Sequence, residues 1–142
     1  MRVVRPGMCD DAVLARPTLL SRQIEQTMQL PHRVEKPWGH ELIWAKTDRY
    51  VGKILHIDPG HLLSLQYHEE KDETIYVLSG EIVFRVQIDG ELTEQRMREG
   101  ERYHITPGTI HQMEAIVSSD LLEVSTPELD DVVRLEDRYG RV

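Results

Sequence analysis

The sequence predicts an all-β protein, a single barrel or double sheet preceded by a short N-terminal helix or arm. Three observations support this. After Pro31, short stretches of alternating apolar and polar residues follow one another at even spacing, and turn residues separate them. Asp89-Gly90 lies between two such stretches and is a hairpin signal. At 142 residues, the chain is long enough to bury one independent core.

The N-terminal part, residues 1–32, is expected to form an arm and a short helix ahead of a barrel over residues 33–142. Residues 1–16 show no periodicity. Pro17–Met28 is typical of a helix, because proline suits a first helical turn and Leu20, Ile24 and Met28 recur every four residues. This segment is interpreted as a packing helix.

The barrel is expected to contain nine strands ahead of a C-terminal tail. Each has the period-two alternation or the β-branched content of a strand, bounded by turn residues. Residues 130–138 are expected to form either a last short helix or an extended tail. The predicted strands are Glu41–Lys46, Tyr50–Ile57, Leu62–His68, Glu73–Leu78, Glu81–Ile88, Glu91–Met97, Glu101–Ile105, His111–Ile116 and Asp120–Thr126.

Four residues at fixed spacings predict a metal site. Gln66 and His68 are two apart on a predicted strand, so their side chains point to the same face. The charged turn that follows brings Glu73 back beside His68, and His111 arrives after the turn at 106–109. Two imidazoles, a carboxylate and an amide oxygen suit a divalent ion and leave coordination positions open, which is typical of catalytic rather than structural sites.

The segments 60–80 and 100–111 resemble the two motifs of the cupin superfamily. Gln66 replaces the first histidine of the first motif, and Pro107 is displaced by one position in the second. A Gln-x-His pair is similar to that of mannose-6-phosphate isomerases. The resemblance extends over roughly residues 33–142 to the C-terminal domain of type II mannose-6-phosphate isomerase/mannose-1-phosphate guanylyltransferases. The residues in register with the cupin motifs are Gly60, His68, Glu73, Gly80, Gly100, Gly108 and His111.

The resemblance implies a single cupin (jelly-roll) β-barrel that isomerises a sugar phosphate between aldose and ketose through a cis-enediolate. The implied cofactor is a divalent metal, zinc first, with manganese, iron, cobalt or nickel as alternatives. Lys53 is the candidate catalytic acid or base or, alternatively, a partner of the phosphate, and Glu123 is a further candidate base. The partner is a small-molecule sugar phosphate, and a homodimer is expected. The candidate substrate-binding residues are Arg138, Arg141 and Ser64.

Several of these positions leave two interpretations open. Lys53 either points into the barrel or, if the strand has the other parity, into solvent. Glu123 either lines the site or forms a surface salt bridge. Arg138 and Arg141 either bind a phosphate or belong to a solvated tail.

The chain also departs from the family near the expected site. Gln112 stands where relatives carry an arginine, and Glu69 and Glu70 stand where they carry histidines. These changes are expected to remove groups that would help hold an anionic sugar.

Two other functions remain open: a non-catalytic cupin that binds a sugar or small acid, and a metal-dependent dioxygenase. The net charge of −8, with no basic stripe, argues against nucleic-acid binding. No apolar run approaches the roughly 20 residues of a membrane span, and no signal core is visible, so a cytoplasmic protein is expected. The single Cys9 excludes an intramolecular disulfide.

Overall fold

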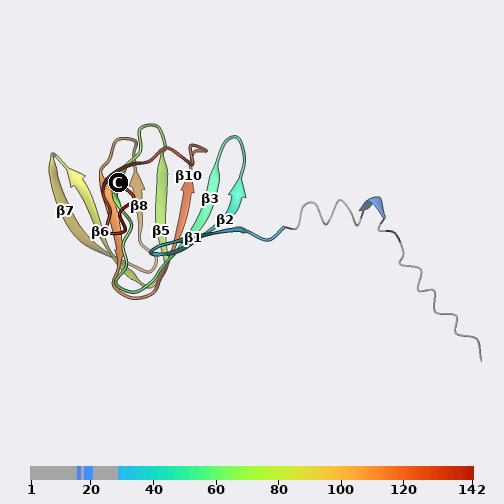
Figure 1. The fold of residues 1–142 in the computed structure, drawn as a ribbon, viewed down its shortest axis with the longest axis horizontal. Coiled ribbons are helices and arrows are strands. Elements are labelled where there is room, and N and C mark those ends of the chain that lie inside the picture. Colours follow the sequence, from blue (N-terminus) through green and yellow to red (C-terminus); the bar gives the residue numbers. More distant parts are fainter. Residues whose placement is uncertain (1–15, 17, 21–28) are drawn as a thin grey trace, which may run out of the picture.

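The computed structural model describes residues 16, 18–20 and 29–142, and within them the chain forms two antiparallel sheets (Figure 1). The first sheet has the strand order β1-β2-β3-β10-β5-β8 and the second has the order β11-β4-β9-β6-β7. The all-β prediction is confirmed. The strands are β1 (His32–Lys36), β2 (Gly39–Lys46), β3 (Val51–Ile57), β4 (Leu65–Tyr67), β5 (Glu73–Ser79), β6 (Glu81–Ile88), β7 (Glu91–Arg98), β8 (Arg102–Ile105), β9 (His111–Ala115), β10 (Ser119–Ser125) and β11 (Val133–Glu136).

The ends of the chain differ most from the sequence prediction. The helix expected between Pro17 and Met28 lies, apart from residues 18–20, outside the described residues. Strand β1 was not expected, and it forms an edge hairpin with β2. Gly39 begins β2 with φ +145°, where an added Cβ would lie 2.0 Å from the His56 carbonyl oxygen, so the tight approach of β2 to β3 requires glycine.

One predicted strand is shorter than expected, and the structure decides between the two alternatives for the C-terminal segment. Of the stretch 62–68, only Leu65–Tyr67 forms a strand, and Leu62 makes an isolated bridge to Glu114. The segment 130–138 is extended rather than helical, because β11 pairs with β4 along it. The pairing brings the C-terminal tail back against the barrel.

The core lies between the two sheets, and β3, β5, β6 and β9 each supply alternate residues to it, as the period of two requires. Tyr103 and Tyr139 pack against it from the edge. A 2.7 Å hydrogen bond between the Tyr139 hydroxyl and His61 Nδ1 connects the C-terminal tail to the barrel. The largest fully buried apolar side chains are Phe84, Leu55, Ile57, Ile75, Ile82, Ile105, Met113 and Leu121.

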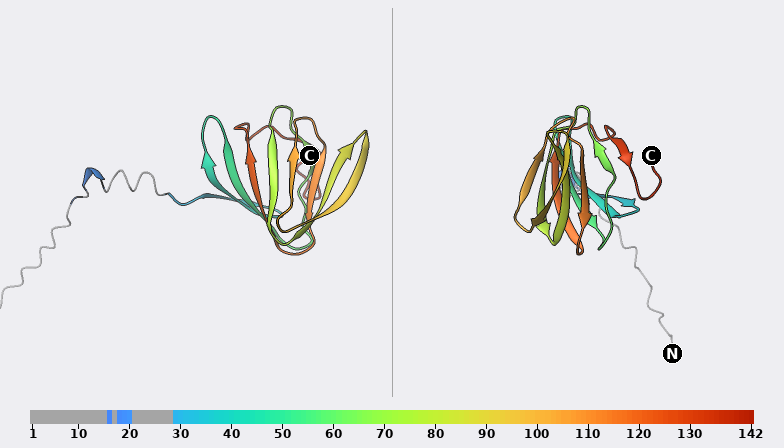
Figure 2. Two further views of the ribbon diagram at one scale, coloured as in Figure 1. Left: turned by 180° about the vertical axis from the view of Figure 1, so that it is seen from behind. Right: turned by 90° about the vertical axis from the view of Figure 1, so that its left-hand side faces the viewer.

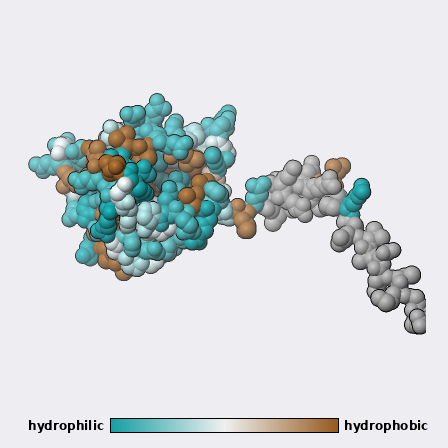
Figure 3. All heavy atoms as spheres, viewed as in Figure 1, coloured by the Kyte–Doolittle hydropathy of each residue, from teal (hydrophilic) through white to brown (hydrophobic). Residues whose placement is uncertain are grey.

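A cavity of about 220 Å³ lies where the barrel is covered by β1 and the tail. β1 and the C-terminal segment lie on the same side of the sheets (Figure 2, right). The surface seen in Figure 3 is mostly hydrophilic, with hydrophobic atoms in separate patches. Among the described residues, no helix combines the length and apolar character needed to cross a membrane.

Candidate metal centre

His68, Glu73 and His111 converge inside the barrel. His68 follows β4, Glu73 opens β5 and His111 opens β9. Glu73 Oε1 lies 3.2 Å from Nε2 of each histidine, and the three ligand atoms lie within 4.8 Å of one another. All three side chains are buried. Two imidazoles and one carboxylate at this spacing can hold a divalent metal ion.

Backbone carbonyls orient both imidazoles. His68 Nδ1 contacts the Asp131 carbonyl oxygen, and His111 Nδ1 lies 2.8 Å from the Thr109 carbonyl oxygen. A proton on each Nδ1 leaves the Nε2 lone pairs directed at Glu73, the arrangement that metal-binding histidines usually have. His111 Nε2 is buried and has no aligned hydrogen bond to any described residue. A metal would supply the partner that this nitrogen lacks, so the site fits such an ion.

Gln66 reaches the same region from β4. It lies directly opposite His111 in the β4–β9 pair, and opposed residues of an antiparallel pair point to the same face. Ser64 Oγ donates a 2.7 Å hydrogen bond to Gln66 Oε1, and both side chains line the cavity with His68. Ser64 therefore fixes the amide oxygen of Gln66, and the role of Gln66 as a ligand stays a prediction.

Asp131 holds the loop between His68 and Glu73, a role that sequence reasoning missed. Its carboxylate accepts hydrogen bonds from the backbone N–H groups of Glu69, Glu70 and Lys71, at 3.0, 2.7 and 2.8 Å. These three donors lower the pKa of Asp131. Its own carbonyl oxygen accepts from His68 Nδ1. One residue thus fixes both the ring orientation of His68 and the loop that delivers Glu73.

Replacing Asp131 by alanine is expected to weaken metal binding by about 10- to 100-fold, because loss of such supporting groups usually costs that much. The dissociation constant of zinc, measured by competition with a chromogenic chelator, checks this. Asp48→Ala, in the exposed β2–β3 turn, is the control. An unchanged zinc affinity in Asp131→Ala would show that the loop holds its position without the carboxylate.

A chain of alternating charges leads from Glu73 through the cavity wall. Lys71 Nζ lies 2.8 Å from Glu73 Oε2 and 3.5 Å from Glu123 Oε1. Lys53 Nζ lies 4.0 Å from Glu123 Oε2 and 3.3 Å from Glu41 Oε2. Lys53 faces inward with a relative exposure of 8%, and Glu123 lies directly opposite it across the β3–β10 pair. Both side chains thus line the cavity that also holds His68.

The two buried carboxylates differ in their proton affinity. Burial raises the pKa of Glu73, but its close polar contacts with Glu123, His111 and His68 and the charge of Lys71 outweigh it, so the net shift is downward. Burial, together with the charge of Glu73, raises the pKa of Glu123 to about 8. Glu73 is therefore the ionised carboxylate that a metal ligand must be, and Glu123 is the one with the greater affinity for a proton.

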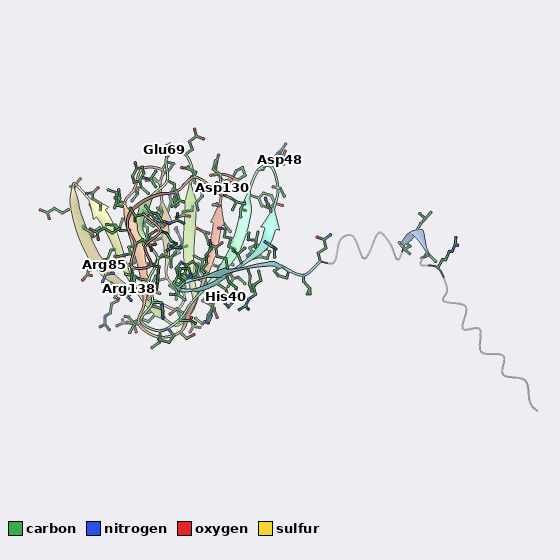
Figure 4. The ribbon with its side chains drawn as sticks, viewed as in Figure 1. His40, Asp48, Glu69, Arg85, Asp130 and Arg138 are labelled. Carbon is green, nitrogen blue, oxygen red and sulfur yellow. The ribbon has the colours of Figure 1, made fainter. Side chains whose placement is uncertain are left out.

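The two tail arginines lie in different environments. Arg141 lines the cavity, but Asp137 holds its guanidinium through Nε and Nη2 at 2.7 and 2.9 Å. This pair lowers the pKa of Asp137 to about 2. Arg138 is exposed, is not among the residues that line the cavity, and donates a 2.8 Å hydrogen bond to the Gly60 carbonyl oxygen. Figure 4 shows Arg138 lower on the barrel than Glu69 and Asp130.

The departures from the family pattern lie away from the cavity. Gln112 follows His111 on β9 and so points to the opposite face of the sheet. It accepts a hydrogen bond from Arg85 Nη1 and donates one to the Leu63 carbonyl oxygen. Glu69 and Glu70 are exposed at the barrel end. None of the three side chains lines the cavity, and their effect on the binding of an anionic sugar stays a prediction.

Comparison with protein families agrees with this geometry. The family model "Mannose-6-phosphate isomerase C-terminal" matches residues 23–137. The chain belongs to this family. It is 40% identical over 117 residues to the mannose-1-phosphate guanylyltransferase ManC of Salmonella typhimurium strain LT2, covering 78% of this chain and 24% of the relative. The mannose-1-phosphate guanylyltransferase of Escherichia coli strain K12 is 37% identical over 129 residues, covering 84% and 26%.

Solved structures confirm the cupin fold of this mannose-6-phosphate isomerase C-terminal domain. The capsular polysaccharide assembling protein CapF of Staphylococcus aureus superposes with a TM-score of 0.62 at 23% identity, over 75% of this chain and 34% of that one. The structure of Bacillus subtilis oxalate decarboxylase at pH 4.6 superposes with a TM-score of 0.65 at 14% identity, over 79% of this chain and 32% of that one. At these identities the likeness concerns the fold alone. The chain spans about a quarter of the length of the guanylyltransferases it matches.

Proposed function

We propose that this protein is a metal-dependent aldose–ketose isomerase that acts on a sugar phosphate, in the manner of mannose-6-phosphate isomerases. One observation carries the proposal: a buried His–Glu–His cluster, in which His111 Nε2 has no aligned hydrogen bond to a described residue, adjoins through His68 a cavity whose wall holds a Lys–Glu–Lys chain. Zinc is the first choice of metal, with manganese, iron, cobalt or nickel as alternatives. Membership of the family supports the substrate class.

Gln66, His68, Glu73 and His111 would hold the metal, which when bound supplies the positive charge that stabilises a cis-enediolate. Glu123 is the proposed base that takes the C2 proton and returns it to C1. Its buried carboxylate lies between Lys71 and Lys53, so both of its oxygens keep a fixed direction. Lys53 is the proposed hydrogen-bond donor to the reacting oxygens, because it reaches the cavity from the strand opposite Glu123.

Substrate binding by Ser64, Arg138 and Arg141 stays a prediction from the sequence. Ser64 and Arg141 line the cavity and could contact a sugar there, whereas Arg138 would first have to leave the Gly60 carbonyl oxygen. The expected homodimer and the expected cytoplasmic location likewise stay predictions.

Exchange of the C2 proton tests the proposed reaction. The protein, loaded separately with zinc, manganese, cobalt or iron, is offered mannose 6-phosphate and other hexose and pentose phosphates in deuterated water. Metal-dependent loss of the C2 proton signal in the NMR spectrum is the expected result. No exchange with any metal and any sugar phosphate would overturn the isomerase proposal.

Glu123→Gln should lose C2 exchange by at least about 100-fold while it keeps its metal, because a positioned base contributes roughly 10²–10⁴-fold. The glutamine retains the size of the side chain but cannot accept the proton. Exchange rate and bound metal are measured on the same sample, with Glu91→Gln on exposed β7 as the control. Exchange at the wild-type rate in Glu123→Gln would assign the base elsewhere.

The alternative of a non-catalytic binding cupin rested on the missing arginine at position 112. Since Gln112 points away from the cavity, that observation no longer favours it.

A further inference from the structure

The side chain of Arg134 makes no ion pair with any of the described residues. It comes from β11 and lines the cavity, and its Nε is buried without a hydrogen bond to any described residue. A buried guanidinium nitrogen that has lost water and gained no acceptor is costly. Such an atom in a cavity wall indicates that a ligand supplies the acceptor.

The other partly buried arginines among the described residues are neutralised by carboxylates. Arg85 contacts Glu94 and Glu114 at 2.6 and 2.8 Å, and Arg141 is held by Asp137. Arg134 has no such ion pair within the described part of the chain, although it lies in the same tail as Arg141. Its charge is therefore available inside the cavity.

Strand register places Arg134 in line with the metal centre. It lies opposite Gln66 in the β11–β4 pair, and Gln66 lies opposite His111 in the β4–β9 pair. Opposed residues share a face, so all three side chains project from the same side of the sheet. Neighbouring strands are about 4.8 Å apart, which separates the backbones of Arg134 and His111 by roughly 10 Å. A single sugar in its open-chain form can extend between a metal at one end and the guanidinium at the other.

The charge of the cavity favours an anion. Its lining holds five cationic and three acidic side chains, and two carboxylates outside the lining, Glu73 and Asp137, pair with Lys71 and Arg141. Arg134 is therefore the cation of the lining that no carboxylate of the described residues neutralises. The acidic members already pair with lysines, except Asp130, which is exposed. The cationic members are Lys36, Lys53, Lys71, Arg134 and Arg141, and the acidic ones are Glu41, Glu123 and Asp130.

We propose that Arg134 anchors the anionic group of the ligand, at the end of the cavity away from His111. A planar guanidinium binds two oxygens of a phosphate or carboxylate at once, and Arg134 lines the cavity with its Nε buried and without an acceptor among the described residues. The identification of the anion as the phosphate of a sugar rests on the proposed function. The binding of an anion by Arg134 is independent of that function.

Calorimetric titration of the zinc-loaded protein tests this without turnover. The probes are a hexitol 6-phosphate, which has no carbonyl to isomerise, the unphosphorylated hexitol, and inorganic phosphate. The wild-type protein should bind the hexitol phosphate at least tenfold more tightly than the hexitol. Arg134→Gln should bind the hexitol phosphate about 10- to 100-fold more weakly with its zinc content unchanged. Arg134→Lys should recover part of the loss, since it keeps the charge but not the fork.

Arg102→Gln, which removes the same charge from exposed β8, is the matched control and should bind as the wild type does. Wild-type affinity for the hexitol phosphate in both Arg134→Gln and Arg134→Lys would overturn the anchor. So would a wild-type protein that binds neither the hexitol phosphate nor inorganic phosphate. Binding of inorganic phosphate that depends on Arg134, without preference for the hexitol phosphate, would support the anion anchor and count against the sugar-phosphate substrate.

Discussion

Replacing His111 by alanine is expected to remove both the bound metal and C2 proton exchange. His111 is completely buried, and its Nε2 has no aligned hydrogen bond to any residue that the structure describes. Alanine leaves an empty volume beside Glu73 and His68, and the metal site loses one strong ligand. Because each ligand is needed for a tight site, metal content should fall from about one ion per chain to a small fraction of that.

Metal analysis after gel filtration, together with thermal unfolding with and without zinc, measures this. Zinc should raise the unfolding temperature of the wild type, since an ion that binds only the folded state stabilises it. It should not do so for His111→Ala. His104→Ala removes an exposed histidine from neighbouring β8 and should behave as the wild type does. Full metal content and zinc-dependent stabilisation in His111→Ala would rule out this cluster as the metal site.

The metal cluster could be predicted from the sequence because strand parity and glycine spacing are local. His68 and Glu73 are five residues apart, and the turn between them fixes their encounter. The inward direction of Lys53 needed the structure, since a strand with apolar residues on both faces does not reveal which face meets the core. The position of Lys53 opposite Glu123 answers this, because the two buried side chains meet inside the barrel.

Asp131 and Arg134 could not be found by local reasoning. Asp131 acts on residues about 60 positions earlier through their backbone N–H groups, and backbone groups leave no signature in the sequence. Arg134 is one of several arginines in a charged tail, and only the β11–β4 register distinguishes it from Arg138. Gln112 shows the reverse: a departure from a motif carries little weight when the strand turns that side chain away from the site.

Lys71→Met is expected to lower the free energy of unfolding of the metal-free protein by about 3–5 kcal/mol, the usual cost of breaking a buried ion pair from one side. Lys71 is 5% exposed and lies between Glu73 and Glu123. Burial lowers its pKa, but the charges of these two carboxylates outweigh that and raise it, so Lys71 is charged. Methionine keeps the volume of the side chain and leaves two neighbouring buried carboxylates without their common cation.

Zinc should reverse part of this loss, because the ion bound by Glu73 supplies positive charge on the other side of the same carboxylate. Urea unfolding of the wild type and of Lys71→Met, each measured with chelator and with saturating zinc, therefore distinguishes the contribution of Lys71 to stability from that of the metal ion. We expect the difference from wild type to be larger in chelator than in zinc. Lys46→Met, on the exposed end of β2, controls for the loss of a lysine. A difference below about 1 kcal/mol in chelator, as for a surface pair, would mean that Lys71 does not hold the two carboxylates together.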